Sequence, residues 1–469
     1  MEISTPNAQR SQVAQSNHFP PQIKYIVGNE ACERFSYYGM RCILVLFMVK
    51  LLHMEENRSG AIYHEFATAC YLLPLLGAWL SDRYLGKYKT IMLLSIVYCL
   101  GHLALSLWEN SFGLYVGLAL IALGSGGIKP CVSAHVGDQF NEKNSHLLPK
   151  IFEVFYFSIN FGAFFSTLAM PWTLDHYGPR LAFGIPGILM AIATFVFWMG
   201  RHQYVHVPPT GKTGATGFMT ILIYSLTHLK DRRPGDSILD IARAKYKAQD
   251  VEAAKAAASI FKVFAAVSIF WALFDQTGSS WVLQADKMDK MVWGFELNAA
   301  QIGAINPILV MVLIPIFSLG VYPLVAKLGF KVTPLRKMSA GMALAALSFV
   351  MVAMFQTIID AGGTLSIGWQ LLPYFVITCS EVLVSITGLE FAYTQAPGSM
   401  KSTIMSFWLL TVAVGNQLVA LIMESGLFKK QDASFFYSFA GMMFALAMVF
   451  IFMATRYRIK NYVGSTAVA

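Results

Sequence analysis

The chain has 469 residues, of which 56% are apolar and only 13% are charged. Because soluble globular domains carry about 25% charged residues, this composition excludes an ordinary soluble enzyme, a disordered chain and a secreted disulfide scaffold. The net charge of +9 would suit nucleic acid or anionic lipid, so the distribution of the basic residues along the chain decides what it means.

The chain begins with a polar, proline-containing stretch, residues 1–22. A cleavable signal peptide would need a basic segment followed by a short apolar core, and this stretch has neither. We expect residues 1–22 to form a cytoplasmic tail.

Apolar runs of roughly 20 residues, about twelve in all, occupy most of the remaining sequence. Runs of this length indicate transmembrane helices, because a chain in lipid must satisfy its backbone hydrogen bonds within each segment. The first six runs are Ile23–Leu52, Ala61–Trp79, Thr90–Trp108, Ser111–Cys131, Ile151–Leu174 and Leu181–Trp198. The last six are Ser259–Leu283, Ala300–Leu328, Met338–Ile359, Leu371–Tyr393, Ser402–Met423 and Phe435–Ala454. We expect an all-α membrane protein with two six-helix bundles, residues 23–200 and 259–455.

The first run contains charged and aromatic residues that share one helical face at 100° per residue. They are Glu30, Glu33, Arg34, Tyr37, Tyr38 and Arg41. Each ionised group costs about 2.5–3.5 kcal/mol in the middle of a membrane on insertion scales. We therefore expect this face to line a polar cavity.

The loop after the second run is Gly77-Ala-Trp-Leu-Ser-Asp82-Arg83-Tyr-Leu-Gly86-Lys87. It resembles the loop motif of major facilitator superfamily transporters, whose fold is two six-helix bundles around a midplane site. A fainter copy, Gly320 to Lys331, follows the eighth run and lacks the Asp-Arg pair.

Isolated polar residues recur in later runs. They are Lys129 in the fourth, Glu153, Tyr156 and Asn160 in the fifth, Trp271 and Asp275 in the seventh, Asn306 in the eighth, and Glu381 and Glu390 in the tenth. A lone Asn or Tyr could equally make a structural hydrogen bond between helices. For Lys129, Asp275 and Glu381 a functional role is favoured, because charge in a membrane segment is costly.

Residues 201–258 are polar and separate the two sets of runs. This segment is the predicted cytoplasmic linker, and residues 456–469 are the predicted cytoplasmic C-terminal tail. Its Gly211-Lys212-Thr213 lacks the upstream glycine of a phosphate loop, so no nucleotide-driven pump is indicated. Phe218–Leu229 could lie at the membrane interface. Most loop Lys and Arg residues fall on the side of the termini, which makes that side cytoplasmic and removes the need for a nucleic-acid partner.

The deeper ionisable residues number four acids and three bases. The acids are Glu30, Glu33, Asp275 and Glu381, and the bases are Arg34, Arg41 and Lys129. A carboxyl without a cationic partner binds a proton most readily in such a cavity, which suits a proton-coupled process. Cations in the first half and Glu381 in the second half suit a zwitterion such as a short peptide.

These residues resemble the proton-dependent oligopeptide transporter family of the major facilitator superfamily. The resemblance is carried by Glu30-x-x-Glu33-Arg34-Phe35-x-Tyr37-Tyr38-Gly39, Tyr63-His64, Phe155-Tyr156-Phe-Ser-Ile-Asn160-x-Gly162, Phe270 to Ser279, and Glu381-Val-Leu-Val-Ser385-x-x-Gly388. It covers nearly the whole chain, and several motifs are of the animal type.

The resemblance implies roles for the residues. Glu30, Glu33, His64 and Asp275 would couple protons. Arg34 and Lys129 would bind the peptide carboxylate, and Asn160, Asn306 and Glu381 its amino end. Tyr37, Tyr38, Tyr71, Tyr156, Trp271, Ser385 and Trp408 would complete the substrate site. Arg41 with Asp275 would form an outer gate and Lys129 with Glu381 an inner one. A structural hydrogen bond is the alternative role for His64.

One difference from the animal members of the family bears on the kind of organism and membrane that contain this protein. Animal members have a large extracellular domain between the ninth and tenth helices, whereas only about residues 360–367 separate them here. The compact form favours a bacterial inner membrane.

We expect a proton-coupled symporter for di- and tripeptides that works by alternating access. Its partners would be peptides, protons and membrane lipid, with no obligate protein partner and no cofactor beyond the proton. A symporter of the same family for nitrate or another small metabolite is the alternative. An enzyme is disfavoured because the Gly-x-Ser-x-Gly and His-Glu-x-x-His motifs and any Cys/His metal spacing are absent from the sequence.

Overall fold

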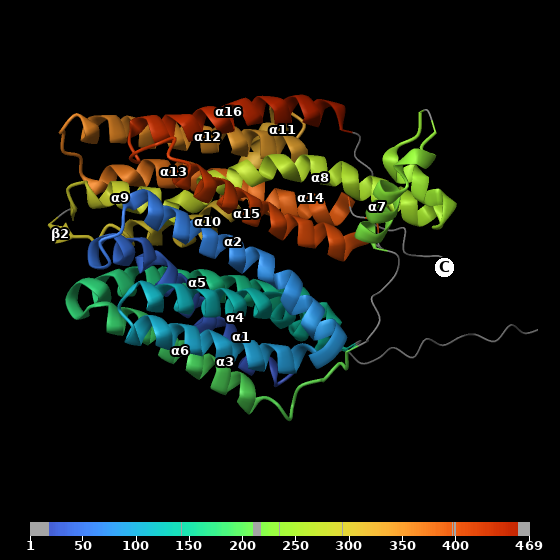
Figure 1. Cartoon of the computed structure of the whole chain (residues 1–469), viewed down its shortest axis with the longest axis horizontal. Coiled ribbons are helices and arrows are strands. Elements are labelled where there is room, and N and C mark those ends of the chain that lie inside the picture. The colour runs from blue at the N-terminus through green and yellow to red at the C-terminus, as the bar shows by residue number, and fades with distance from the viewer. Residues whose placement is uncertain are drawn as a thin grey trace, which may run out of the picture.

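The computed structural model describes residues 18–457 apart from 142, 210–216, 234, 293, 396, 398 and 399. The Gly211-Lys212-Thr213 segment and most of both predicted tails lie outside the described residues. Long helices run side by side along the longest axis of the molecule (Figure 1). A short hairpin of β1 (Met291–Val292) and β2 (Phe295–Glu296) forms the one sheet of the described chain.

The helices fall into two sequential sets. The first set contains α1 (Ile23–Leu46), α2 (Glu56–Leu80), α3 (Lys87–Leu107), α4 (Ser111–Asp138), α5 (Leu148–Tyr177) and α6 (Pro179–Met199). The second set contains α8 (Ala248–Phe274), α9 (Ser280–Asp286), α10 (Ile305–Pro315), α11 (Tyr322–Lys327), α12 (Pro334–Asp360), α13 (Leu371–Glu381), α14 (Thr387–Gln395), α15 (Lys401–Glu424) and α16 (Ala433–Arg456). We call these sets the first half and the second half.

In the described part of the chain, ten helical segments are long and apolar enough to cross a membrane. The first two expected spans, α1 and α2, lie outside that group although both form helices of membrane length. In α1 the reason is charge, because this helix carries Glu30, Glu33, Arg34 and Arg41 within its 24 residues. In α2 the polar residues Tyr63, His64 and Glu65 lower the mean hydropathy of the apolar stretch.

In the second half, three predicted helices change their winding within the span. The run predicted as Ser259–Leu283 is interrupted by a 3₁₀ turn, Asp275–Gly278, between α8 and α9. A π-helical segment, Ile316–Val321, follows Pro315 and separates α10 from α11, and a second one, Val382–Ile386, separates α13 from α14. Proline removes a backbone donor, and π turns inside helices are frequent at functional sites.

Each half is held together mainly by its own helices. In the first half α3 packs on α4, and α1 packs on α5 and α6; in the second half α12 packs on α16, and α8 packs on α15. The principal contact between the halves joins α2 to α15. Glycines permit close approach, since a Cβ at Gly77 of α2 would overlap the backbone of Gly127 in α4.

The predicted linker lies at one end of the molecule, together with α7 (Phe218–Thr227) (Figure 1). We call this end the linker end. Phe218 packs edge-on against Phe261 of α8 and Phe407 of α15, which fixes α7 to the second half. Helix α8 begins at Ala248, so its first turns are formed by residues that the sequence assigned to the linker.

Candidate functional site

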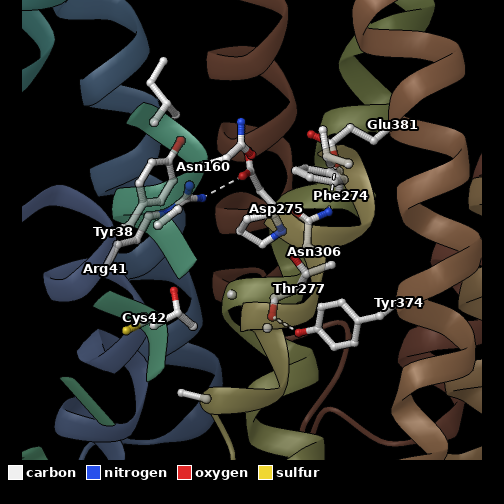
Figure 2. Close-up of a pocket in the computed structure, with 18 of the residues that line it drawn as sticks. Tyr38, Arg41, Cys42, Asn160, Phe274, Asp275, Thr277, Asn306, Tyr374 and Glu381 are labelled. Atoms are coloured by element: carbon white, nitrogen blue, oxygen red, sulfur yellow. Dashed lines mark hydrogen bonds and ion pairs between the residues drawn. The ribbon is translucent and has the colours of Figure 1, made fainter. Parts of the chain in front are cut away.

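A cavity of about 290 Å³ lies between the two halves. Its lining includes Tyr38, Arg41, Tyr63, Tyr71, Tyr156 and Asn160 from the first half, and Trp271, Asp275, Asn306, Tyr374 and Glu381 from the second. Figure 2 shows side chains from opposite helices converging on this space. The mixture of aromatic walls and a few converging polar groups is typical of a small-molecule site.

An ion pair crosses the cavity. Arg41 Nη2 of α1 donates to Asp275 Oδ1 at 2.6 Å (Figure 2). The Arg41 guanidinium also lies 4.9 Å from the ring centroid of Tyr63 in α2. Both side chains are nearly buried, so the pair is shielded from water and joins the halves more strongly than an exposed pair would.

A buried asparagine extends this pair to a histidine. Asn416 of α15 donates through Nδ2 to Asp275 Oδ2 at 2.6 Å and to the Val412 carbonyl at 2.9 Å. These two acceptors orient the amide, so its oxygen faces His64 Nδ1 at 2.7 Å. An amide oxygen only accepts, so Nδ1 carries the proton in this bond.

The other ring nitrogen of His64 completes the network. His64 Nε2 lies 2.8 Å from the Ser279 hydroxyl in the second half, and the His64 side chain is fully buried. A continuous chain of hydrogen bonds therefore runs from Ser279 through His64, Asn416 and Asp275 to Arg41. This network fixes which nitrogen of His64 carries the proton, and the same hydrogen bonds connect the two halves.

The acidic side of the cavity lies in the second half. Asn306 Nδ2 donates to Glu381 Oε2 at 2.9 Å and to Thr378 Oγ1 at 3.0 Å. Glu381 has no ion-pair partner among the described residues. Its carboxylate is therefore available to a cationic ligand group.

A second charged cluster lies on α1, away from the cavity lining. Arg34 Nε donates to Glu30 Oε1 at 2.7 Å and lies 3.2 Å from Glu33 Oε2 without hydrogen-bond geometry. Glu33 is 2% exposed, and its other oxygen accepts from Ser125 Oγ at 3.4 Å. Glu33 is therefore the less well paired of the two carboxyls.

Lys129 packs on aromatic rings. Its Nζ lies 4.6 Å from the ring centroid of Tyr37 and 4.7 Å from that of Tyr71. Tyr71 lines the cavity, while Tyr37 is 1% exposed and does not. In this conformation Lys129 forms no ion pair with Glu381, which instead accepts a hydrogen bond from Asn306. The predicted Lys129–Glu381 gate therefore stays a prediction.

The ends of the helices opposite the linker end are joined across the halves by further polar contacts. We call this end the closed end. The contacts are Lys50 with Asp286, Lys287 with Glu56, Arg58 with Glu424, Asn57 with the Phe428 carbonyl, and Gln301 with the Leu168 carbonyl. Together with Arg41 and Asp275 they close this end in the present conformation.

The structure thus gathers part of the predicted set around the cavity: Tyr38, Arg41, Tyr71, Tyr156, Asn160, Trp271, Asp275, Asn306 and Glu381. The predicted residues outside the lining are Glu30, Glu33, Arg34, Tyr37, His64, Lys129, Ser385 and Trp408. Trp408 packs edge-on against Trp271, with ring centroids 6.4 Å apart, and so supports a lining residue. Ser385 lies in the π-helical segment after α13.

Sequence reasoning missed Asn416, Ser279 and Tyr374 as parts of the site. Tyr374 donates to the Thr277 carbonyl at 3.0 Å beside the cavity (Figure 2). Asn416 stands in the middle of an apolar run, so the rule that singled out Asn160 applies to it equally. Ser279 is the last residue of the Phe270 to Ser279 motif but was given no role. No comparable signal distinguishes Tyr374 among the tyrosines.

Comparison with known proteins places this geometry in context. Residues 88–434 match the family model described as PTR2, POT family. Human solute carrier family 15 member 2 is 40% identical over 80% of this chain and 54% of its own length. The chain thus spans about half of that relative. Human solute carrier family 15 member 1 is 29% identical over 94% of both chains.

Solved structures show the same fold. An auto-inhibited POT family peptide transporter superposes with a TM-score of 0.87 at 39% identity, covering 96% of this chain and 99% of its own. The POT family transporter PepTSo gives a TM-score of 0.87 at 41% identity, covering 95% and 99%. The expected all-α transporter fold of the major facilitator type is confirmed.

Proposed function

Because the chain belongs to the POT family of membrane transporters, we propose that it is a proton-coupled symporter that imports di- and tripeptides by alternating access. Membership of this family makes the protein a transporter and not an enzyme. One relative of this fold is named a peptide transporter, and another was solved with alafosfalin bound. Those names support a peptide as the substrate of this chain.

The observation that carries the proposal is the division of charge around the cavity. Glu381 lies in the second half without an ion-pair partner among the described residues. Lys129 and Arg34 lie in the first half, and Lys129 touches Tyr71 of the cavity wall. A peptide has an ammonium group and a carboxylate several ångströms apart, so it can bridge the halves, with Asn160 and Asn306 near its amino end.

Protons would be the coupling ion, and we propose no other cofactor. Glu30 and Glu33 lie beside Arg34, and a proton on Glu33 would leave Arg34 paired with Glu30 alone. His64 and Asp275 would form the second proton-coupling group, since both belong to the hydrogen-bonded chain that joins the halves. Protonation of Asp275 would weaken its attraction to Arg41 and favour opening of the closed end.

The gates would alternate. Arg41 and Asp275 are paired while Lys129 and Glu381 are apart, as expected if the second pair forms only when the linker end closes. The remaining pocket residues, Tyr37, Tyr38, Tyr156, Ser385 and Trp408, would accept varied side chains through aromatic and weakly polar contacts. Rocking of two bundles about a fixed site is the general mechanism of this architecture.

The protein is an integral membrane protein. We propose a bacterial inner membrane with both termini in the cytoplasm, supported by the basic linker and by the short connection of residues 360–367. Lipid would be its surroundings, and we propose neither a nucleic-acid nor an obligate protein partner. A nitrate symporter is less well supported, because a simple anion has no use for Glu381.

Uptake into proteoliposomes tests the proposal. Labelled Ala-Ala should accumulate above equilibrium only when an inward proton gradient is imposed. N-acetylated Ala-Ala, which lacks the ammonium group, should compete poorly in the wild type. Absence of peptide flux in folded protein, with flux of nitrate or a small organic anion, would overturn the peptide assignment.

A further inference from the structure

A second cavity, of about 310 Å³, lies at the linker end of the second half, away from the central cavity. It is lined almost entirely by apolar atoms. The lining comes from the π-helical segment before α11, from α11, from the start of α12 and from Leu383 of the π-helical segment after α13. We call it the lateral cavity.

The lateral cavity lies beside a loosely packed helical segment, the π-helical Ile316–Val321 with α11. Phe317, Val321 and Val325 recur every four residues and face the cavity. None of the residues from Ile316 to Lys327 is buried. Both Val321 and Leu383 belong to π-helical segments, whose i→i+5 bonding disturbs the regular interlocking of side chains. Exposed apolar surface of this kind often marks a binding site.

The rim of the cavity is basic. Lys331, Arg336 and Lys337 lie along it, where one apolar span ends at Lys327 and the next begins at Pro334. Glu390 lies 3.8 Å from Lys337. Lys337 also lies over the Tyr322 ring at 4.6 Å. Lys331 and Arg336 have no carboxylate within ion-pair distance in the described chain, so their charge is uncompensated.

We propose that the lateral cavity binds an anionic phospholipid, with an acyl chain in the apolar space and the phosphate on Lys331 and Arg336. An apolar cavity excludes water but accepts an apolar ligand. Basic pockets between membrane helices attract anionic headgroups. Polarity and position thus agree: the apolar lining lies along the span, and the cations lie where the span ends. This inference does not depend on what the central cavity transports.

Native mass spectrometry of the full-length protein in detergent tests the site, with dioleoyl phosphatidylglycerol and dioleoyl phosphatidylcholine as probes. We expect wild type to bind the anionic lipid about tenfold more tightly than the zwitterionic one. K331Q/R336Q should reduce this preference to about twofold or less by removing the two unpaired cations. Unchanged preference in K331Q/R336Q would overturn the proposal.

Two variants test the acyl-chain part. V321W places an indole in the cavity and should lower the occupancy of both lipids. L319W changes the same segment at a side chain that is 80% exposed, so it should leave binding unchanged. Equal effects of V321W and L319W would overturn the assignment of the acyl chain to this cavity. K331Q/R336Q alters exposed side chains only, so it remains decisive if V321W does not fold.

Two further arms separate the sources of binding. K429Q/K430Q removes an exposed basic pair at the closed end and should not change lipid preference. Glycerol 3-phosphate, which has the headgroup charge but no acyl chain, should not displace phosphatidylglycerol at millimolar concentration. Displacement would identify a site for free phosphate and would overturn the proposal that the cavity binds a phospholipid.

Discussion

Arg41 of α1 and Asp275, at the end of α8, form an ion pair of 2.6 Å that joins the two halves beside the central cavity. The other oxygen of this carboxylate accepts a hydrogen bond from Asn416 of α15. Asp275 therefore contacts both a cation and an amide, and a change in its charge alters its contacts with α1 and with α15 together.

Charge reversal tests this pair. R41D or D275R alone leaves two like charges facing each other in a nearly buried place, where loss of one partner costs about 3–5 kcal/mol. Each single variant should therefore lose most peptide uptake, and R41D/D275R should recover part of it. K50Q, which removes an exposed cation of the closed end, should have little effect. Absence of any recovery in the double variant would show that the two charges do not act as a pair.

Removal of the bridging amide tests the chain of hydrogen bonds. N416L removes one hydrogen-bond partner from His64 and one from Asp275, which keep Ser279 and Arg41. The unsatisfied buried groups should cost about 1–3 kcal/mol of stability and reduce proton-driven uptake strongly. S279A removes the other hydrogen-bond partner of His64. Ser279 makes no bond to Asp275, so the effect of S279A on uptake should be smaller than that of N416L. Melting temperature and uptake of the two variants provide the comparison. Equal uptake in both would argue against a role for the Asn416–Asp275 bond.

Sequence reasoning could locate much of this site because charge inside an apolar run is conspicuous. The α1 face, Asp275 and Glu381 were all identified on that ground. Asn416 obeys the same rule and was overlooked, so this omission was not a limit of the sequence. The breaks in α8, α10 and α13 could not be foreseen, since hydropathy reports the length of a span but not its winding.

Which residues of the site contact each other was harder to predict than which residues belong to it. Residue type and helical face indicate that Lys129 and Glu381 are polar and point inward, but not which conformation is adopted. Lys129 can be satisfied by the rings of Tyr37 and Tyr71 as well as by a carboxylate. A sequence pattern does not rank these alternative partners.

A close contact at the closed end provides a steric prediction. A Cβ at Gly278 would overlap the Tyr63 hydroxyl, so G278A should push the Tyr63 ring away from Arg41 and impair uptake. Removing the hydroxyl relieves most of the overlap, so G278A/Y63F should transport better than G278A. Y63F alone is the control for loss of the hydroxyl. If the double variant were no better than G278A, overlap with Tyr63 would not be the cause of the defect.

The start of α16 predicts a pH effect on stability. The Ser434 hydroxyl and backbone N–H groups donate to Asp432 and lower the pKa of its carboxyl, although partial burial opposes them. Because the folded value lies below the unfolded one, this stabilisation is complete above the ordinary value of about 3.9 and is lost as the pH falls through the folded value. D432A should cost about 1 kcal/mol at pH 6.

Melting temperatures from pH 6 downward check this. The difference between wild type and D432A should shrink as the pH falls below the ordinary Asp range, whereas K429Q in the same loop should show no such trend. A difference that stays constant over the whole pH range would mean that the charge of Asp432 is not what stabilises the helix.

The two carboxyls beside Arg34 should differ in their roles. Glu30 accepts the Arg34 Nε hydrogen bond, whereas Glu33 lies near the guanidinium without one. E33Q mimics a permanently protonated Glu33 and keeps Arg34 paired, so it should abolish accumulation driven by a proton gradient while sparing counterflow exchange. E30Q breaks the better-formed pair and should impair both.

Measurement of counterflow and uphill uptake in the same proteoliposome preparation separates these outcomes, with the exposed E109Q as control. Loss of uphill uptake with retained exchange requires that substrate still binds and that both gates still move. The defect must then lie in the coupling to protons. Normal proton-driven accumulation by E33Q would instead remove Glu33 from the coupling route and leave Glu30, His64 and Asp275 as the remaining proton-coupling groups.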